Sequence, residues 1–369
     1  MGMKAVATGL LLLFVAAADG KAAPVLETVA EMDHAPGNIG VLPDGRVIVS
    51  EHPTGRPETV AAIIDKGKVS PFPPGGWSKV LSAEPARGEE GMRPVLGVRA
   101  DATGIVWMLS GNGNQALKHL YAWDTKTNAM LHDYTFDKDA TGPRSFLNDL
   151  ALAPRHGKIF ISDPAGDADA SIAIVDLQTG KLTRRLQGDM SVRSEPIDAV
   201  IDGKVVGSTG PDGKARPLRG AVNPITIDRQ EEWLYYAPLS GRTVYRVRVA
   251  DLLDASLSEE ALSKKVEHYA EKPASAGITI DNAGNIYVAD VQARGIGVTS
   301  PKEGYRLLVQ DDTRLDWADG IATGPDGYIY VASSELYRFL PSHRVDNAPP
   351  KPPFYITRFK ALADTTVGR

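Results

Sequence analysis

The chain has 369 residues, a formal net charge of −5 and no cysteine. The negative balance and the lack of long basic runs argue against nucleic acid or an anionic membrane as a partner. The absence of cysteine excludes disulfides, thiolate metal sites and a cysteine nucleophile. With 36 glycines, 26 prolines and 43% hydrophobic residues, the composition is typical of one large, turn-rich β domain.

The first two dozen residues have the pattern of an export signal. Lys4 supplies a positive charge, residues 5–17 are apolar, and residues 16–18 are three alanines of the small type that a signal peptidase requires. We therefore expect a cleaved signal peptide over residues 1–23 and a secreted or periplasmic domain over residues 24–369. An uncleaved signal anchor is the alternative, although the apolar stretch is short for a membrane span.

One phrase then recurs six times: a small or polar residue, a short apolar run, a turn that usually contains glycine, and a second apolar run. A phrase repeated at intervals of tens of residues indicates a repeat architecture. The first apolar runs of the six copies are expected at residues 37–41, 96–99, 148–152, 223–227, 276–280 and 319–323.

Each copy is expected to form a β-hairpin, because β-branched and aromatic residues suit pleated strands and the glycines suit tight turns. The spacing leaves room for four antiparallel strands per copy, which is the size of a propeller blade. The sequence therefore predicts an all-β fold, a six-bladed β-propeller with a central channel. Six innermost strands crowd one axis, which explains their content of Gly, Ala and Thr. Residues 250–265 are the best candidate for a helix and are expected to form a short insertion.

Propeller geometry places candidate site residues at one mouth of the channel, where ligands commonly bind. Asn38, Asn148, Asn223 and Asp319 hold near-equivalent positions at the start of the inner strand in four blades. Their oxygens, aimed at one axis, would form the shell that Ca²⁺ or another divalent cation prefers. The alternative is that these residues cap strand ends and satisfy backbone groups.

Other polar and aromatic residues are expected near the same mouth. Asp149 and Asp163 are candidates for a general base or a further metal ligand, although Asp163 precedes a proline and suits a turn equally well. The candidate ligand-binding residues are Glu51, His52, Arg294 and Trp317. Of these, His52 could transfer a proton or could simply be a surface imidazole.

Several segments resemble the major royal jelly protein/yellow family. They are residues 146–152 (FLNDLAL), 159–163 (IFISD), 173–177 (AIVDL), 235–240 (YYAPLS), 309–312 (VQDD) and 315–320 (LDWADG). The resemblance extends over roughly residues 36–360. It implies an exported six-bladed propeller with a ligand site at the channel mouth, in a family that includes proteins implicated in dopachrome conversion, binders of biogenic amines and storage proteins. Ala318 stands where the family has proline, and the lack of cysteine suggests a bacterial relative.

The expected fold is also similar to that of gluconolactonases and paraoxonases. In those proteins Asn and Asp residues at blade starts hold Ca²⁺, and a lactone is hydrolysed. Asn148 and Asp319 are the positions that best match that pattern. The gluconolactonase glutamate of the first blade has no clear counterpart, since Gly37 and Asn38 stand there and Glu51 is distant.

Two classes of function follow. The first is a metal-assisted enzyme that hydrolyses a lactone or tautomerises a dopachrome-like compound, with no organic cofactor. The second is a non-catalytic binder of a small amine or aromatic ligand, held by the acidic funnel and by aromatics such as Trp317. In both cases we expect a monomer with a small-molecule ligand and with neither nucleic acid nor membrane as a partner.

The export signal gives a direct test. Because a charged segment, an apolar segment and a small-residue cleavage site occur in order, the mature chain should begin between Asp19 and Pro24. N-terminal sequencing of protein recovered from the periplasm or the medium measures this. A full-length product that stays in the cytoplasm would contradict the expectation.

Overall fold

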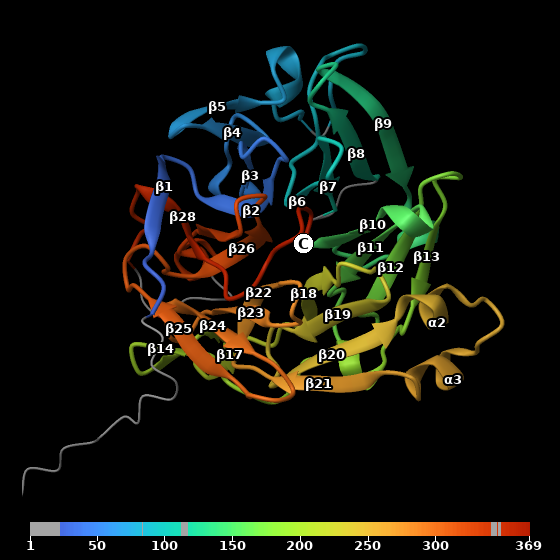
Figure 1. Ribbon diagram of the computed structural model, residues 1–369, viewed down its shortest axis with the longest axis vertical. Coiled ribbons are helices and arrows are strands. Elements are labelled where there is room, and N and C mark those ends of the chain that lie inside the picture. Colours follow the sequence, from blue (N-terminus) through green and yellow to red (C-terminus); the bar gives the residue numbers. More distant parts are fainter. Residues whose placement is uncertain (1–22, 83, 112–116, 341–344, 346–347) are drawn as a thin grey trace, which may run out of the picture.

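Six four-stranded antiparallel sheets are arranged in a ring around one axis (Figure 1). The computed structural model describes residues 23–82, 84–111, 117–340, 345 and 348–369. The signal peptide predicted for residues 1–23 therefore lies, except for its last residue, outside the described residues. The protein is a six-bladed β-propeller, as the sequence predicts, and the six repeats form the innermost hairpins of the six blades.

The strands of the first three blades, from the axis outward, are β2 (Pro36–Val41), β3 (Val47–Glu51), β4 (Ala61–Asp65), β5 (Lys68–Phe72); β6 (Gly97–Ala100), β7 (Ile105–Ser110), β8 (Lys118–Asp124), β9 (Ala129–Phe136); and β10 (Leu150–Ala153), β11 (Lys158–Asp163), β12 (Ser171–Asp176), β13 (Leu182–Arg185). Those of the last three are β18 (Val222–Ile227), β19 (Trp233–Pro238), β20 (Thr243–Arg248), β21 (Glu267–Glu271); β22 (Ser275–Ile280), β23 (Ile286–Asp290), β24 (Gly295–Thr299), β25 (Arg306–Gln310); and β26 (Ala318–Thr323), β27 (Tyr328–Ser333), β28 (Phe354–Lys360), β1 (Glu27–Met32).

The sixth blade closes the ring by combining both ends of the described chain. Strand β1 pairs antiparallel with β28, from Glu27 opposite Arg358 to Met32 opposite Phe354. An ion pair of 2.9 Å between the carboxylate of Glu27 and the guanidinium of Arg358 supports this register. The outermost strand of the last blade therefore comes from the beginning of the sequence.

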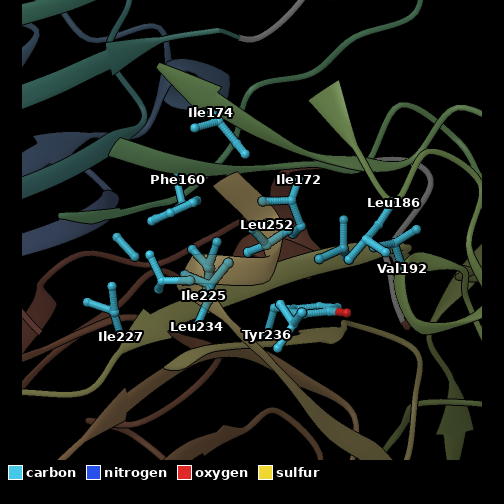
Figure 2. Close-up of a cluster of buried hydrophobic side chains, with 14 of the residues drawn as sticks. Phe160, Ile172, Ile174, Leu186, Val192, Ile225, Ile227, Leu234, Tyr236 and Leu252 are labelled. Atoms are coloured by element: carbon cyan, nitrogen blue, oxygen red, sulfur yellow. The ribbon is translucent and has the colours of Figure 1, made fainter. Parts of the chain in front are cut away.

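The core consists of one apolar layer between each pair of neighbouring blades. Figure 2 shows the layer between the third and fourth blades, where Phe160 and Ile174 face Ile225 and Leu234. A blade has two apolar faces and cannot bury either one alone, so each blade depends on both neighbours. A seventh cluster lies among the loops at the channel mouth and includes Trp317.

Short elements decorate the ring. The hairpins β14 (Val200–Ile201) with β15 (Lys204–Val205) and β16 (Gly207–Thr209) with β17 (Ala215–Pro217) lie between the third and fourth blades in sequence. The helices and 3₁₀ turns are α1 (Lys138–Thr141), α2 (Val249–Leu253), α3 (Glu259–Ser263), α4 (Leu336–Phe339), η1 (Pro53–Gly55), η2 (Gly75–Ser78), η3 (Pro154–His156) and η4 (Met190–Val192). Helices α2 and α3 confirm the short helical insertion predicted around residues 250–265. No helix within the described ranges is long and apolar enough to span a membrane.

The segment that follows β28 fills the channel at the end opposite to the starts of the inner strands (Figure 1). Thr323, the last residue of β26, donates its backbone N–H to the carbonyl oxygen of Arg369 at 2.9 Å. The guanidinium of Arg369 is buried, donates to the carbonyl of Leu152 at 3.2 Å and lies 3.5 Å from the carboxylate of Glu231. These contacts join the sixth blade, through the backbone of Arg369, to the third and fourth blades, through its side chain.

Replacing Arg369 should therefore destabilise the ring. Arg369→Met leaves the 2%-exposed carboxylate of Glu231 buried without its ion partner, which typically costs about 3–5 kcal/mol. The matched control is Lys264→Met, which removes an exposed ion pair with Glu260 and should change stability by less than about 1 kcal/mol. Urea unfolding of the two variants and the wild type measures both values. Equal stability of the two variants would show that the tail does not brace the blades.

Candidate functional site

Inner strands of the ring carry a β-bulge at the mouth of the channel. Pro36 of β2 pairs with Glu51 of β3, and Ile39 pairs with Val49. Between these two pairs β2 advances by three residues and β3 by two, so β2 contains one extra residue. The same shift occurs in β18, β22 and β26. In the third blade the backbone of Ser162 bonds to both Asn148 and Asp149 just before β10 begins. A bulge adds one residue and re-aims a side chain, often at a functional site.

The bulge residues form the floor of a cavity of about 450 Å³ at the channel mouth. The residues that line it are Gly37, Asn38, His52, Pro53, Thr54, Pro94, Leu96, Phe146, Asn148, Asp149, Asn223, Leu239, Ala276, Trp317, Asp319, Leu336 and Leu340. The floor is polar and the walls are mostly apolar, which is the usual composition of a small-molecule site.

Close backbone contact between blades fixes the positions of the floor residues. A Cβ atom on Gly277 would lie 1.9 Å from the carbonyl oxygen of Asp319, and one on Gly97 would lie 2.6 Å from that of Asn148. Neither distance is sterically possible, so only glycine permits these neighbouring inner strands to approach so closely. The glycines of the repeated phrase thus bring Asp319 and Asn148 to the axis.

One side of the floor is a buried network centred on Arg99, which lies in β6. Its guanidinium donates to the Asn38 side-chain oxygen at 3.0 Å and to the Ile39 carbonyl at 2.8 Å, and lies 3.4 Å from the Asp149 carboxylate. The side-chain amide of Asn38 donates to Asp149 at 2.9 Å, and the N–H of Leu150 donates to the same carboxylate at 2.7 Å. Burial raises the pKa of Asp149, and the positive charge of Arg99 opposes that rise.

The other side of the floor holds polar groups without partners. Among the described residues, no hydrogen bond or ion pair reaches the carboxylate of Asp319 or the side-chain amide of Asn148, and the side-chain oxygen of Asn223 is buried without a hydrogen-bond donor. Burial, reinforced by the negative charge of Asp149, raises the pKa of Asp319 to about 8. Its side chain is enclosed by protein but part of it faces the cavity.

The predicted metal ligands thus meet at one cavity but differ in their availability. Asn38 has a side-chain oxygen that already accepts from Arg99 and from the N–H of Ile39, so it has little capacity for a cation. Asn148, Asn223 and Asp319 present one uncommitted carboxylate and two uncommitted amides, which fits a hard cation. Across the described ranges, no three His, Asp or Glu side chains are grouped for metal binding, so such a shell depends on asparagine.

The walls contain His52 and Trp317 from the predicted ligand-binding set. His52 follows β3, is 7% exposed, and accepts the backbone N–H of Thr54 at its Nδ1 at 3.2 Å. Trp317 precedes β26 in the left-handed region, with φ of 53°, and packs 6.0 Å from the ring of Tyr337. Both side chains line the cavity beside Leu336 of α4.

The other three predicted residues, Asp163, Arg294 and Glu51, do not line the main cavity. Asp163 is fully buried, accepts the N–H of Phe146 at 2.8 Å and pairs with Arg184 at 3.3 Å, so it positions the segment that leads to Asn148. Arg294 binds both carboxylate oxygens of Asp202, at 2.9 and 2.6 Å.

Arg294 also contacts Asp316 at 3.3 Å, next to the cavity residue Trp317. Glu51 lines a neighbouring, smaller cavity. A position next to the channel mouth in sequence therefore does not by itself place a side chain in the lining of the main cavity.

Sequence reasoning missed Arg99, whose guanidinium contacts the side chains of Asn38 and Asp149 on the cavity floor. The available signal was a lone arginine in an inner strand that is otherwise small and apolar, GVRA. Lys and Arg are almost never fully buried unless paired, so this residue required a carboxylate or several carbonyls nearby. Arg99 is 1% exposed and has both.

Fold and cavity define a class of protein: a closed six-bladed propeller with an axial pocket that opens at one end of the channel. Residues 95–348, more than half of the chain, match the family described as major royal jelly protein. The chain belongs to the major royal jelly protein family, and the resemblance read from the sequence motifs is confirmed. No curated protein matches the chain.

Solved structures with the same architecture have low sequence identity. A gluconolactonase from Xanthomonas campestris aligns with a TM-score of 0.54 and 12% identity over 91% of this chain and 89% of its own. A calcium-binding protein, regucalcin, from Agrobacterium tumefaciens aligns with a TM-score of 0.55 and 14% identity over 94% and 97%. A streptogramin B lyase aligns with a TM-score of 0.52 and 14% identity over 91% and 97%. At such identities the similarity establishes the fold alone.

The raised pKa of Asp319 predicts how the stability of the metal-free protein depends on pH. The unfolded carboxyl ionises near its ordinary value of 3.8, while the folded one ionises near 8. Between these values the unfolded state releases its proton first, so the folded state loses stability as pH rises. Asp319→Asn should therefore be more stable than the wild type at pH 9, by roughly 1–3 kcal/mol, and differ little at pH 4.

Urea unfolding in the presence of a chelator measures this difference. The matched control is Asp312→Asn at an exposed position, which should show no pH-dependent gain. If the stability of the wild type and of Asp319→Asn changed with pH in parallel, the raised pKa of the Asp319 carboxyl would be contradicted.

Proposed function

We propose that this protein is a cation-dependent hydrolase of a small cyclic ester. The observation that carries the proposal is the set of uncommitted oxygens on the cavity floor, from Asn148, Asn223 and Asp319. A buried polar group without a partner costs free energy, as for the side-chain oxygen of Asn223, and the half-buried side chains of Asn148 and Asp319 beside it line the same cavity, so the three suit a common ligand. Oxygen ligands of this kind favour Ca²⁺ or Mg²⁺ over softer metals.

In this proposal the three oxygens hold the cation at one side of the floor. A divalent cation bound there would polarise an ester carbonyl and acidify water. Asp319 would supply the only formal negative charge of the shell, and cation binding would require its proton to leave. Affinity should therefore rise with pH up to the pKa near 8.

Asp149 is the proposed proton acceptor. It lines the cavity beside Asp319, and burial raises its pKa, which makes a carboxylate a stronger base. Arg99 and Asn38 would hold its carboxylate in place through the contacts at 3.4 and 2.9 Å. The apolar wall, with Phe146 and Trp317, would exclude bulk water and hold the ring of the substrate.

A second candidate is a non-catalytic binder of a small aromatic or amine ligand. The observation in its favour is that Asp149 is already committed to Arg99, Asn38 and the backbone of Leu150. A carboxylate held this way is a poorer base than its raised pKa suggests. In that case the aromatic wall would provide affinity and no bond would be broken.

We also propose that the protein is exported and acts as a monomer without nucleic acid or membrane partners. The leader pattern and the net charge of −5 support export and argue against polyanionic partners. A closed ring of six blades buries its inner faces without a second subunit.

Removing the floor carboxylate tests the cation shell. Asp319→Ala should bind Ca²⁺ at least tenfold more weakly than the wild type, which corresponds to about 1.4 kcal/mol or more, because it lacks the one formal charge of the shell. Asn223→Leu keeps the size of the side chain but removes its oxygen, and should also weaken binding. Calorimetric Ca²⁺ titration measures the affinities, with Asp312→Ala as the exposed control.

A panel of lactones, assayed with Ca²⁺ and with chelator, then separates the two candidate functions. Cation-dependent hydrolysis that is lost in Asp319→Ala and kept in Asp312→Ala would support the enzyme. Equal Ca²⁺ binding by all variants, or none by any, would contradict the shell and favour the metal-free binder.

A further inference from the structure

A second, smaller cavity lies beside the main one. Its volume is about 240 Å³, below the range of pockets that take a whole drug-sized ligand. The residues that line it are Glu51, Pro53, Arg56, Pro57, Val60, Val80, Pro94 and Val95. Pro53 and Pro94 line both cavities, so the two spaces are immediate neighbours.

Glu51 is the unusual member of this side pocket. It is the last residue of β3, is 7% exposed, and its Oε2 atom is buried without a hydrogen-bond partner among the described residues. Burial raises the pKa of its carboxyl. The structure surrounds it with proline and valine side chains. A hydrogen bond from the Thr59 side chain opposes the rise in its pKa but leaves Oε2 without a donor, which is costly for a buried atom. A ligand that donates a hydrogen bond would remove that cost.

Arg56 restricts which donor is suitable. It follows η1 in the left-handed region, with φ of 52°, and its exposed side chain lines the same pocket. Its positive charge repels a second cation in this small space. A neutral hydroxyl donates a hydrogen bond to the carboxyl without that repulsion and is less costly to desolvate than an ammonium.

We propose that the side pocket is a specificity subsite for a hydroxyl-bearing apolar substituent of the ligand bound in the main cavity. The hydroxyl donates to the Glu51 carboxyl, and the ring or chain that carries it packs against Pro53, Val60 and Val95. The inference deepens the proposed function, on which it rests, by assigning to the cyclic ester an apolar substituent that ends in a neutral donor.

Two matched probes test the subsite. They are a γ-butyrolactone with a 4-hydroxyphenyl substituent and the same lactone with a phenyl substituent. A hydrogen bond to a charged acceptor contributes about 1.5–3 kcal/mol, so the wild type should bind the hydroxylated probe at least about tenfold more tightly. Calorimetry with the full-length mature protein measures both affinities, and initial rates of ring opening are recorded separately.

Variants then assign the preference to its residues. Glu51→Leu should bind both probes equally, Glu51→Gln should keep part of the preference through its amide oxygen, and Glu58→Gln, at an exposed site of the same loop, should keep all of it. Arg56→Met should improve binding of a 4-(aminomethyl)phenyl probe, which the wild type should reject. Thermal unfolding should show little loss of stability in Glu51→Leu, because that change removes a buried carboxyl oxygen without a donor together with one hydrogen bond from Thr59.

The outcomes distinguish the subsite from the hydrolase. A Glu51-dependent preference without any ring opening would support the subsite and contradict the proposed reaction. Ring opening with no hydroxyl preference in the wild type, or with a preference that survives in Glu51→Leu, would overturn the subsite and leave the reaction standing. Failure of the wild type to bind either probe would also overturn the subsite as stated.

Discussion

Mutual burial of neighbouring blades is the constraint on which this structure depends. Every blade presents an apolar face to each neighbour, and each layer between blades contains residues from both. An open row of such sheets would leave two faces exposed, so the ring must close. Closure is achieved by β1, which completes the sixth blade from the opposite end of the sequence and pairs with β28 over Glu27–Met32.

Closing the ring brings the six inner strands close together around one axis. Residues at the starts of these strands therefore meet at the cavity at the channel mouth. Backbone contacts as close as those at Gly97 and Gly277 leave no room for side chains between the strands. The bulges relieve this regular packing at the channel mouth, and those in β2, β18 and β26 each bring one polar side chain, Asn38, Asn223 or Asp319, to the cavity. Polar groups brought together in this way must find partners, and Arg99 provides them for Asn38 and Asp149 but not for Asp319.

The channel is asymmetric because different segments occupy its two ends. At the far end the residues after β28 bridge blades through Arg369 and the backbone of Thr323. At the near end the bulges, η1 and α4 enclose a cavity of about 450 Å³. Hydrogen bonds and an ion pair between blades therefore hold the end of the channel opposite to the pocket. Support of this kind holds binding groups in place with little loss of freedom when a ligand enters.

The sequence by itself determined the repeat, the number of blades and the identity of the inner strands, because alternation of apolar residues and turn glycines are local properties. It also placed Asn38, Asn148, Asn223 and Asp319 at near-equivalent blade positions, since the repeat aligns them approximately. The strand register shows that Asn148, Asn223 and Asp319 are equivalent, whereas Asn38 stands one residue later, at the position of Asp149. Only the tertiary structure decided which of them keep a free oxygen. That outcome depends on Arg99, a residue of a different blade from any of the four.

The same holds for the residues after the second strands. Their spacing put Asp163, Glu51 and Arg294 near the mouth, but none of the three lines the main cavity: Asp163 bonds to Phe146, Glu51 lines the neighbouring cavity and Arg294 binds Asp202. Asp163 is held by Phe146 and by Arg184 of its own blade, and Arg294 is held by Asp202 of the hairpin between β14 and β15. No pattern within a single strand contains that information, because these hydrogen bonds and ion pairs join segments that only the tertiary structure brings together.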